Sequence, residues 1–497
     1  MKLLQFVARK SLLALGYPRL ETSHPELGVH EVGAYRARMS LSPFVPACQF
    51  FYPVDPNSKT TKRERKEKKN KKGKDKRETT KVDVGFVPYY RKEAVDGLME
   101  FLNGFGDGIL QILQEKAHPL QDAYGVDPLL QHGGEQFPLV LFSHGLGGTM
   151  DMYTELCSQI ASTGCVVVAL EHEDGSASYA TAVTGIESES ETVAIPYKRP
   201  LSNAKVPYSR QKVLDFRTPM LEHRVEELRR ICDSFVVEAP EEANAETGED
   251  YELVRKIVSA TDPSKLHLVG HSFGGATQLL AAQTWAKQDA NAPAPAMEMA
   301  MATATATATT METTAGATSE PLSPPSEGAV PSANSRSSET RPPVPLSITV
   351  YDAWNTALSD RVLEDGLDGK CKDYTQEAPL EILSVLSEGW VTGNPEREQT
   401  LKFLRNCRSP ETNVRSCYAR ESLHQSISDT EAYVPSFAAR KLGNRGRGEP
   451  RHRTIRAVVR EISKFTNPAS TAGRKHDDEI ETDENDHDSV LVPFPLR

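Results

Sequence analysis

The residues best suited to do chemistry lie at 270–275, which read Gly-His-Ser-Phe-Gly-Gly. An apolar stretch at Leu266–Val269 precedes them and an Ala- and Leu-rich stretch without a helix breaker follows, which predicts a strand, a tight turn and a helix. In so tight a turn a side chain at Gly270 or Gly274 would collide with neighbouring backbone. The serine between them is then strained, with its hydroxyl at the positive end of a helix. We predict that Ser272 is a nucleophile, and the alternative is a glycine-rich turn with a capping serine.

A serine in this setting needs an acid and then a histidine further along the chain. Asp352 comes two residues after an apolar stretch at 346–350, where a strand would deliver it to the same edge of the sheet. Asp360, Asp365 and Asp368 are rivals, but they lie further into a polar loop. We predict that Asp352 is the acid.

Two histidines follow Asp352 before the acidic end of the chain, namely His424 and His452. His452 stands between two arginines, whose charge would oppose formation of an imidazolium. His424 is therefore the predicted base. His271 adjoins the nucleophile in sequence, so we expect its side chain to point elsewhere, as a packing or supporting histidine.

An acyl-transfer site also needs two backbone N–H groups directed at the developing oxyanion, each contributing about 10²–10³ in rate. Phe273, the residue after the nucleophile, should supply one of them. The Gly-rich stretch Ser-His-Gly-Leu-Gly-Gly at 143–148 should supply the other, through Leu146. His144 in this stretch could be read as a metal ligand, but no partner lies at ligand spacing.

The elements that must position these residues alternate between strand and helix. Strands are predicted at 137–142, 166–170, 266–269 and 346–350, and helices at 152–161, 221–235 and 276–286. This alternation predicts an α/β fold, a doubly wound and mostly parallel sheet with helices on both faces. Ligands of such sheets bind at the carboxyl ends of the strands.

Three tracts of the 497 residues cannot build a core: a basic run at 59–81, an Ala/Thr/Pro/Ser-rich stretch at 287–343 and an acidic tail at 467–497. We therefore predict one catalytic domain over 1–466, with the first two tracts as disordered insertions and the third as a disordered tail. The basic run carries thirteen Lys/Arg and four Asp/Glu, so the net charge of −11 leaves −20 for the remainder. No nucleic-acid partner is expected, because a domain that binds nucleic acid would be basic.

The seven cysteines are odd in number and form no C-x-x-C pair, which favours reduced thiols over a disulfide framework or a zinc site. Nowhere do about 18 apolar residues follow one another, so no transmembrane helix is expected. We expect no cofactor and no metal. The expected location is the cytoplasm, with peripheral membrane attachment and secretion left open, and the sequence leaves the oligomeric state open.

Five motifs in a fixed order resemble the platelet-activating factor acetylhydrolases of the plasma and type II intracellular kind. They read FSHGLGG (142–148), ALEHEDGSASYA (169–180), GHSFGGAT (270–277), YDAW (351–354) and SLHQSISD (422–429). Weaker matches are PACQFFYP (46–53), AIPYKRPL (194–201) and the stretch around His223–Ile231. The resemblance extends over roughly 40–465, apart from the inserted tracts.

This resemblance implies an α/β-hydrolase fold and a calcium-independent phospholipase A2 activity. Enzymes of this kind remove acetyl, short or oxidised acyl groups from the sn-2 position of phosphatidylcholines. Carried over by motif, the triad is Ser272, Asp352 and His424, with Leu146 and Phe273 as oxyanion donors. It also implies a phospholipid substrate and a peripheral position at a membrane or lipid-particle surface.

Apolar residues between Val95 and Leu113 recur at helical spacing, although Gly104, Gly106 and Gly108 interrupt the pattern. Two interpretations remain open. The helix packs on the sheet, or its apolar face dips into lipid.

Two other functions are kept as alternatives. A general short-chain carboxylesterase or acyltransferase would use the same triad. A non-catalytic hydrolase-fold protein that binds lipid would usually have lost part of it, whereas every element here has a candidate.

Overall fold

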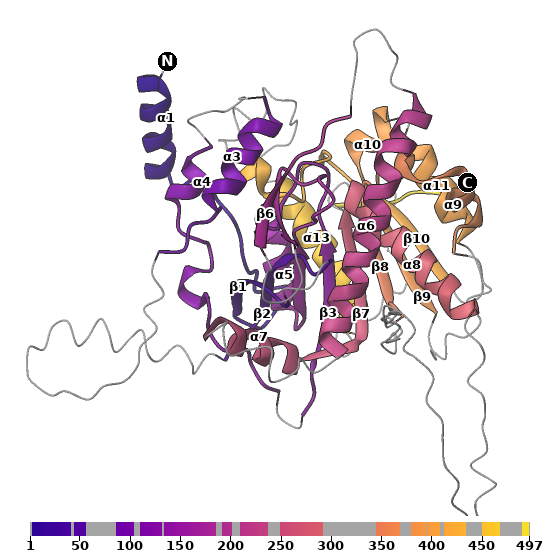
Figure 1. Cartoon of the computed structure of the whole chain (residues 1–497), viewed down its shortest axis with the longest axis horizontal. Helices are drawn as coiled ribbons and strands as arrows, with labels where there is room; N and C mark the ends of the chain where they lie inside the picture. The colour runs from indigo at the N-terminus through magenta and orange to yellow at the C-terminus, as the bar shows by residue number, and fades with distance from the viewer. Residues whose placement is uncertain are drawn as a thin grey trace, which may run out of the picture.

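A computed structural model of the chain contains a large mixed sheet with helices on both faces (Figure 1). The residues that the structure describes are 2–40, 44–55, 86–103, 110–131, 134–184, 191–200, 209–236, 249–291, 344–367, 379–394, 396–407, 412–433, 450–467 and 490–496.

The main sheet has nine strands in the order β1-β2-β4-β3-β7-β8-β9-β10-β11. Its strands are β1 (Val32–Arg38), β2 (Ala47–Pro53), β3 (Phe137–Ser143), β4 (Val166–Leu170), β7 (Thr261–His271), β8 (Ser347–Tyr351), β9 (Leu380–Ser387), β10 (Thr412–Ala419) and β11 (Leu491–Pro493). The six strands from β4 to β10 in this order run parallel, while β1, β2 and β11 pair antiparallel. A separate hairpin joins β5 (Tyr179–Thr184) to β6 (Glu191–Pro196).

The helices divide between the two faces of the sheet (Figure 1). One face is covered by α6 (Arg210–Val236), α7 (Glu249–Ser259), α8 (Phe273–Asn291), α9 (Asp360–Asp365) and α11 (Arg397–Asn406). The other face is covered by α3 (Lys92–Phe101), α4 (Ile112–Glu115), α5 (Thr154–Ser162) and α13 (Pro450–Thr466). The remaining helices are α1 (Lys2–Ala14), η2 (Gln121–Ala123), η3 (Met150–Tyr153), η6 (Asn355–Ala357), α10 (Glu388–Gly393) and η7 (Asp429–Tyr433).

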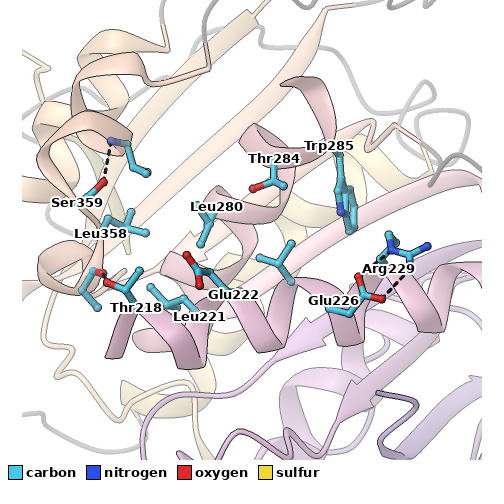
Figure 2. A pocket seen from close by; sticks show the side chains of 13 residues that line it. Thr218, Leu221, Glu222, Glu226, Arg229, Leu280, Thr284, Trp285, Leu358 and Ser359 are labelled. Atoms are coloured by element: carbon cyan, nitrogen blue, oxygen red, sulfur yellow. Dashed lines mark hydrogen bonds and ion pairs between the residues drawn. The ribbon is translucent and has the colours of Figure 1, made fainter. Parts of the chain in front are cut away.

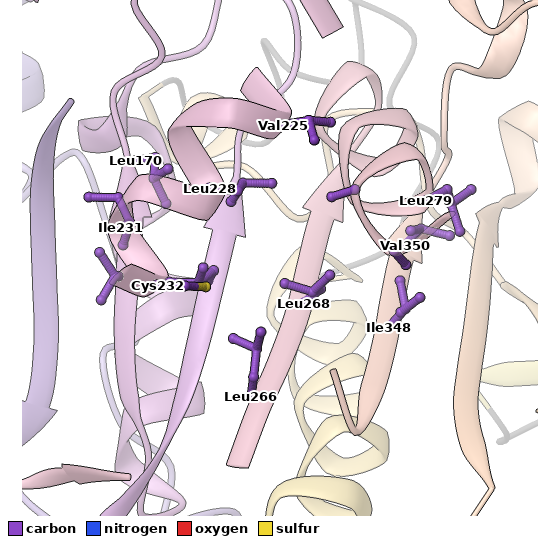
Figure 3. Close-up of a cluster of buried hydrophobic side chains, with 14 of the residues drawn as sticks. Leu170, Val225, Leu228, Ile231, Cys232, Leu266, Leu268, Leu279, Ile348 and Val350 are labelled. Atoms are coloured by element: carbon purple, nitrogen blue, oxygen red, sulfur yellow. The ribbon is translucent and has the colours of Figure 1, made fainter. Parts of the chain in front are cut away.

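Strand residues alternate between the two cores. Leu139 and Leu141 of β3 join the core beneath α6 and α8, whereas Val140 and Phe142 join the core beneath α5 and α13. In Figure 3, Leu228 and Cys232 of α6 lie among the side chains from the strands that this helix covers. Because both faces are covered, the central strands are apolar on both sides, which is the pattern typical of a parallel sheet.

The predicted fold class is confirmed by this topology. All four predicted strands exist, with 166–170 matching β4 at both ends, and the three predicted helices lie within η3 and α5, α6, and α8. The other five strands of the sheet lie outside these predictions.

The apolar helix pattern at 95–113 belongs to the core rather than to a lipid surface. Val95 and Leu98 of α3 are buried, as are Ile112 and Leu113 of α4. Met99, Leu102 and Leu110 are partly buried against the same core, and residues 104–109 lie outside the described residues. The lipid-facing alternative is therefore wrong for these positions, because their side chains are buried in this core and α3 packs against β5 and α4.

Two borders of the predicted tracts differ from the structure. Helix α8 continues to Asn291, inside the tract predicted from 287 to 343. Strand β11 pairs with β10, and Leu491 and Val492 are buried, so the prediction of a disordered tail over 467–497 is wrong for 490–496. The acidic composition of the tail hid the short apolar stretch at its end.

The basic run at 59–81 and residues 292–343 lie outside the described residues, and the division into one domain over 1–466 stays a prediction.

Six of the cysteines lie in the described part of the chain, and all six are buried. Within that part, no helix combines the length and apolar character that crossing a bilayer requires.

Replacing Leu98 by Ser should lower the free energy of unfolding by about 2–5 kcal/mol, because it removes a buried side chain and leaves a cavity. Urea denaturation measures this change, and Glu93→Ser on the exposed face of the same helix is the control. An unchanged stability together with weaker binding to liposomes would restore the lipid-facing interpretation.

Candidate active site

The turn at Ser272 has the geometry that the motif predicts. It lies between the end of β7 and the start of α8, with φ +54° and an exposed fraction of 7%. A Cβ at Gly270 would lie 2.4 Å from the Gly274 carbonyl oxygen, and one at Gly274 would lie 2.0 Å from the Ser143 carbonyl oxygen. Neither position therefore has room for a side chain larger than that of glycine. The left-handed φ of Ser272 is strained, and the surrounding structure must stabilise it.

Backbone hydrogen bonds hold this turn against the end of β8. Ser272 N–H donates to the Tyr351 carbonyl at 2.9 Å, and the Ser272 carbonyl accepts from Trp354 N–H at 2.9 Å. Asp352 lies between these two partners with φ +46°, so the predicted acid sits in a second strained turn beside the first.

The structure brings Asp352 and His424 together. His424 Nδ1 lies 3.1 Å from Asp352 Oδ2, with the carboxylate fully buried and the imidazole about one-third exposed. Ser387 donates to the same carboxylate twice, from its N–H at 2.7 Å and from its hydroxyl at 2.6 Å. These bonds fix the carboxylate plane, and within the described residues no hydrogen bond occupies His424 Nε2.

Within the described residues, no hydrogen bond of 3.5 Å or less joins Ser272 to His424. Hydrogen bonds between a nucleophile and its base are often long before a substrate is bound. The proposed contact between these two side chains therefore stays a prediction.

Two residues near the base were missed by sequence reasoning. The Trp390 ring stacks on the His424 ring, with centroids 4.7 Å apart and planes 15° apart. Ser387 ends β9 and its hydroxyl also accepts the Trp390 N–H at 3.2 Å, which caps α10. The only available signal was a Ser at the end of a strand, and many serines share that position.

The rival residues lie away from this cluster. Asp360 is mostly exposed and pairs with Arg210, and Asp365 pairs with Lys287, while Asp368 lies outside the described residues. His452 on α13 bonds to the buried carboxylate of Glu155, across the sheet from α8.

The Gly-rich loop at 143–148 follows β3 and lies against the nucleophile. A Cβ at Gly145 would lie 3.1 Å from Ser272 Cβ. Gly147 has φ +70°, and its N–H donates to the Ser176 carbonyl at 2.8 Å. Leu146 N–H makes no hydrogen bond within the described part of the chain, and Phe273 N–H belongs to the first turn of α8, where helix N–H groups lack intrahelical partners. Both predicted donors thus keep an N–H available.

Arg224 of α6 is fully buried and clamps this loop. It donates to the His144 carbonyl at 2.8 Å and to Asp174 Oδ2 at 2.9 Å, and its guanidinium lies 4.7 Å from the centre of the Phe273 ring. It also donates to the hydroxyl of Ser176, and the backbone carbonyl of Ser176 accepts the Gly147 N–H. Burial lowers the pKa of Arg224, and the Asp174 carboxylate opposes that shift.

His144 bonds to this loop and to the backbone of His172, and Arg224 Nη2 lies 3.5 Å from its Nδ1. Its Nδ1 donates to the Gly145 carbonyl at 2.8 Å, and its Nε2 accepts the His172 N–H at 3.4 Å. Burial, followed by the nearby Arg224, lowers the pKa of His144 to about 3, so the ring is neutral at pH 7. Both ring nitrogens are thus occupied, which leaves none for a metal.

Two clusters elsewhere in the described residues place carboxylate and imidazole ligand atoms within 4.8 Å of one another: Glu21, Glu155 and His452, and Glu173, His223 and Glu227. Arginines already neutralise both clusters, because Arg451 pairs with Glu155 and Arg38 pairs with Glu173. Neither cluster includes a predicted site residue.

A pocket of about 350 Å³ opens between α6, α8 and α9 (Figure 2). Leu221, Leu280 and Trp285 are among its apolar lining residues, and Glu222 and Glu226 lie at its polar side. None of the five predicted site residues lines it, so it is separate from the site around Ser272.

The chain matches the family model described as platelet-activating factor acetylhydrolase, isoform II, over residues 73–292. That segment contains the Ser272 turn and the 143–148 loop but neither Asp352 nor His424. A platelet-activating factor acetylhydrolase from Gallus gallus is 28% identical over 194 residues, which cover 37% of this chain and 44% of that protein. One from Bos taurus is 31% identical over 148 residues, which cover 29% of this chain and 31% of that protein.

The matched segments thus span less than half the length of either relative. The resemblance drawn from the motifs is confirmed, and the chain is related to this family. Among solved structures, a ferulic acid esterase from Streptomyces cinnamoneus has a TM-score of 0.44 and 13% identity, covering 90% of this chain and 91% of that chain. That likeness is too low to bear on function.

Replacing Arg224 by Met should lower the free energy of unfolding by about 3–5 kcal/mol, because it leaves the buried Asp174 carboxylate without its cation. Urea denaturation measures the loss. Arg230→Met, which removes an exposed cation from the same helix, should change stability by less than about 1 kcal/mol. Equal effects of the two substitutions would contradict the role of Arg224 as a clamp.

Proposed function

We propose that this relative of the platelet-activating factor acetylhydrolases is a serine esterase that hydrolyses the sn-2 ester of phospholipids with acetyl, short or oxidised acyl groups. It would act without calcium and without a cofactor. The observation that carries the proposal is the hydrogen bond between His424 and the buried Asp352, made beside the strained turn of Ser272. The family match over 73–292 supports a phospholipid substrate over other esters.

In the proposed reaction, His424 Nε2 takes the proton of the Ser272 hydroxyl while the oxygen attacks the sn-2 carbonyl carbon. The negative charge moves to the carbonyl oxygen, where the N–H groups of Leu146 and Phe273 stabilise it. The ester bond then breaks, and the lysophospholipid leaves with the proton from His424. Water repeats the sequence on the acyl-enzyme and releases the short acid.

The surroundings of the base support this assignment of roles. Asp352 accepts the Nδ1–H of His424, which puts the lone pair of the neutral ring on Nε2. Trp390 stacks on the imidazole and restricts its rotation, and Ser387 holds the carboxylate. A base whose tautomer and orientation are set in advance has less to reorganise in the transition state.

We also propose a cytoplasmic location with peripheral attachment to a lipid surface. The free and buried thiols of Cys48, Cys157, Cys165, Cys232 and Cys417 suit a reducing compartment. Since α3 and α4 are packed in the core, attachment would use other apolar groups, such as Val7 on α1 and Leu15 directly after that helix, which are each more than half exposed.

The first test is hydrolysis of a 2-acetyl phosphocholine lipid in EDTA, with release of acetate as the readout. Turnover should be unchanged when calcium is added, because no step needs a metal. Turnover of a soluble acetyl ester with none of the phospholipid would instead favour a general carboxylesterase or acyltransferase. If neither ester is cleaved, the non-catalytic lipid-binding alternative holds.

The second test separates the roles of the triad. Ser272→Ala and His424→Ala should each remove nearly all turnover, because the groups act as a unit. Asp352→Asn should lower kcat by about 10³–10⁴, because the wrong histidine tautomer is then favoured. Asp360→Asn, which alters an exposed carboxylate outside the cluster, is the matched control and should retain full turnover. Loss of activity in that control with an active Asp352→Asn would identify a different acid.

A further inference from the structure

A chain of buried hydrogen bonds runs behind Ser272, from the Gly-rich loop to the backbone of the base. Gly145 N–H donates to the Tyr153 hydroxyl at 3.2 Å, and that hydroxyl lies 2.8 Å from His271 Nδ1. His271 Nε2 lies 2.8 Å from the carbonyl oxygen of His424. Tyr153 ends η3, and His271 ends β7 next to the nucleophile.

The atoms at the two ends of the chain determine where its protons lie. The His424 carbonyl can only accept, so His271 Nε2 must carry a hydrogen. Gly145 N–H can only donate, so the Tyr153 oxygen accepts that bond. If His271 were charged, the Tyr153 oxygen would receive two donors, and its own proton would have no acceptor in a described contact. Only a neutral His271 that accepts the Tyr153 proton on Nδ1 satisfies every group.

The surroundings of His271 agree with a neutral ring. Its side chain is buried, and burial lowers the pKa of His271 well below 6.5. The charges of His424 and His144 add to the shift, while the bond to the His424 carbonyl opposes it. The His271 and His424 rings lie 4.6 Å apart, so a cation on His424 opposes a second one on His271.

The two ends of this chain belong to the two parts of the proposed machinery that must flank the substrate. Gly145 immediately precedes Leu146, the proposed oxyanion donor, and its Cβ position lies 3.3 Å from His271 Nδ1. The carbonyl of His424 belongs to the proposed base itself. These parts follow β3 and β10, which are separated in the sheet by β7, β8 and β9, so no strand pairing sets their relative position.

We propose that Tyr153 and His271 are positioning residues that hold the oxyanion loop and the base in register on either side of Ser272. This inference rests on the proposed esterase function. In this proposal neither Tyr153 nor His271 touches the reacting atoms. They act by fixing the backbone at Gly145 and His424.

Four variants test the chain with a soluble acetyl ester, whose turnover does not depend on phospholipid recognition. Tyr153→Phe keeps the ring and removes the hydroxyl, and His271→Leu removes both bonds of the imidazole. Each should lower kcat by about tenfold to a hundredfold with little change in KM, because misplacement of about 1 Å has effects of that size. His271→Gln, whose amide can donate to the His424 carbonyl, should recover part of the loss. Tyr52→Phe removes a hydroxyl of β2 that donates to the Val126 carbonyl, outside the chain of bonds tested here, and should leave kcat unchanged.

The double variant distinguishes positioning from simple packing. If both residues act through one chain, Tyr153→Phe should have no further effect on kcat in the His271→Leu background. Additive losses, a normal kcat in Tyr153→Phe, or no recovery with His271→Gln would overturn the proposal.

A second measurement does not require turnover. The ¹⁵N shifts of labelled histidines should show His271 as the neutral Nε2–H tautomer at neutral pH, and Tyr153→Phe should perturb that signal. A charged ring or the Nδ1–H tautomer would overturn the proposal even if no ester is cleaved. Failure of the phospholipid assay with normal hydrolysis of the soluble ester would count against the proposed substrate alone.

Discussion

The clearance at Gly274 is the constraint on which the rest of the site depends. With a Cβ position only 2.0 Å from the Ser143 carbonyl oxygen, the first turn of α8 touches the end of β3 directly. That contact is possible because the parallel strands β3 and β7 are neighbours whose carboxyl ends lie at the same edge. The serine is forced into a left-handed turn there, and the Gly-rich loop is brought against its Cβ. Nucleophile and oxyanion loop are thus placed by one steric condition.

Charge buried around this contact is balanced group by group. Arg224 is neutralised by Asp174. His172 Nδ1 donates to the Glu227 carboxylate, and its Nε2 lies 2.7 Å from the Ser143 hydroxyl. Burial raises the pKa of Glu227 to about 7, although its bonds to His223 and to the Glu173 N–H oppose that shift. An unpaired charge in such surroundings would be strongly destabilising, so the network fixes the loop in one arrangement.

The sequence was least informative where the meaning of a residue depends on what lies opposite it in space. The apolar pattern of α3 fits a lipid-facing helix as well as a core helix, and only its burial in the core and its contacts with β5 and α4 assign it to the core. Strand β11 was hidden in an acidic tail, because a strand of three residues has too little pattern to be seen. Ser387 and Trp390 belong to no motif and Arg224 belongs only to a weak one, and each gains its role from a partner far away in the chain.

What the sequence determined by itself was local. The glycines around Ser272 predict a turn that only small residues can make, and the alternating apolar stretches predict a covered parallel sheet, because both depend on neighbours within a few residues. The choice of Asp352 over Asp360 needed only its distance from the end of a strand. The tertiary structure decided how the separate pieces meet: the contact of His424 with Asp352, the clamp of Arg224 on the loop, and the bonds that join Tyr153, His271 and the His424 backbone. Those contacts join residues up to 153 positions apart, and folding brings them together through packing that no local spacing encodes.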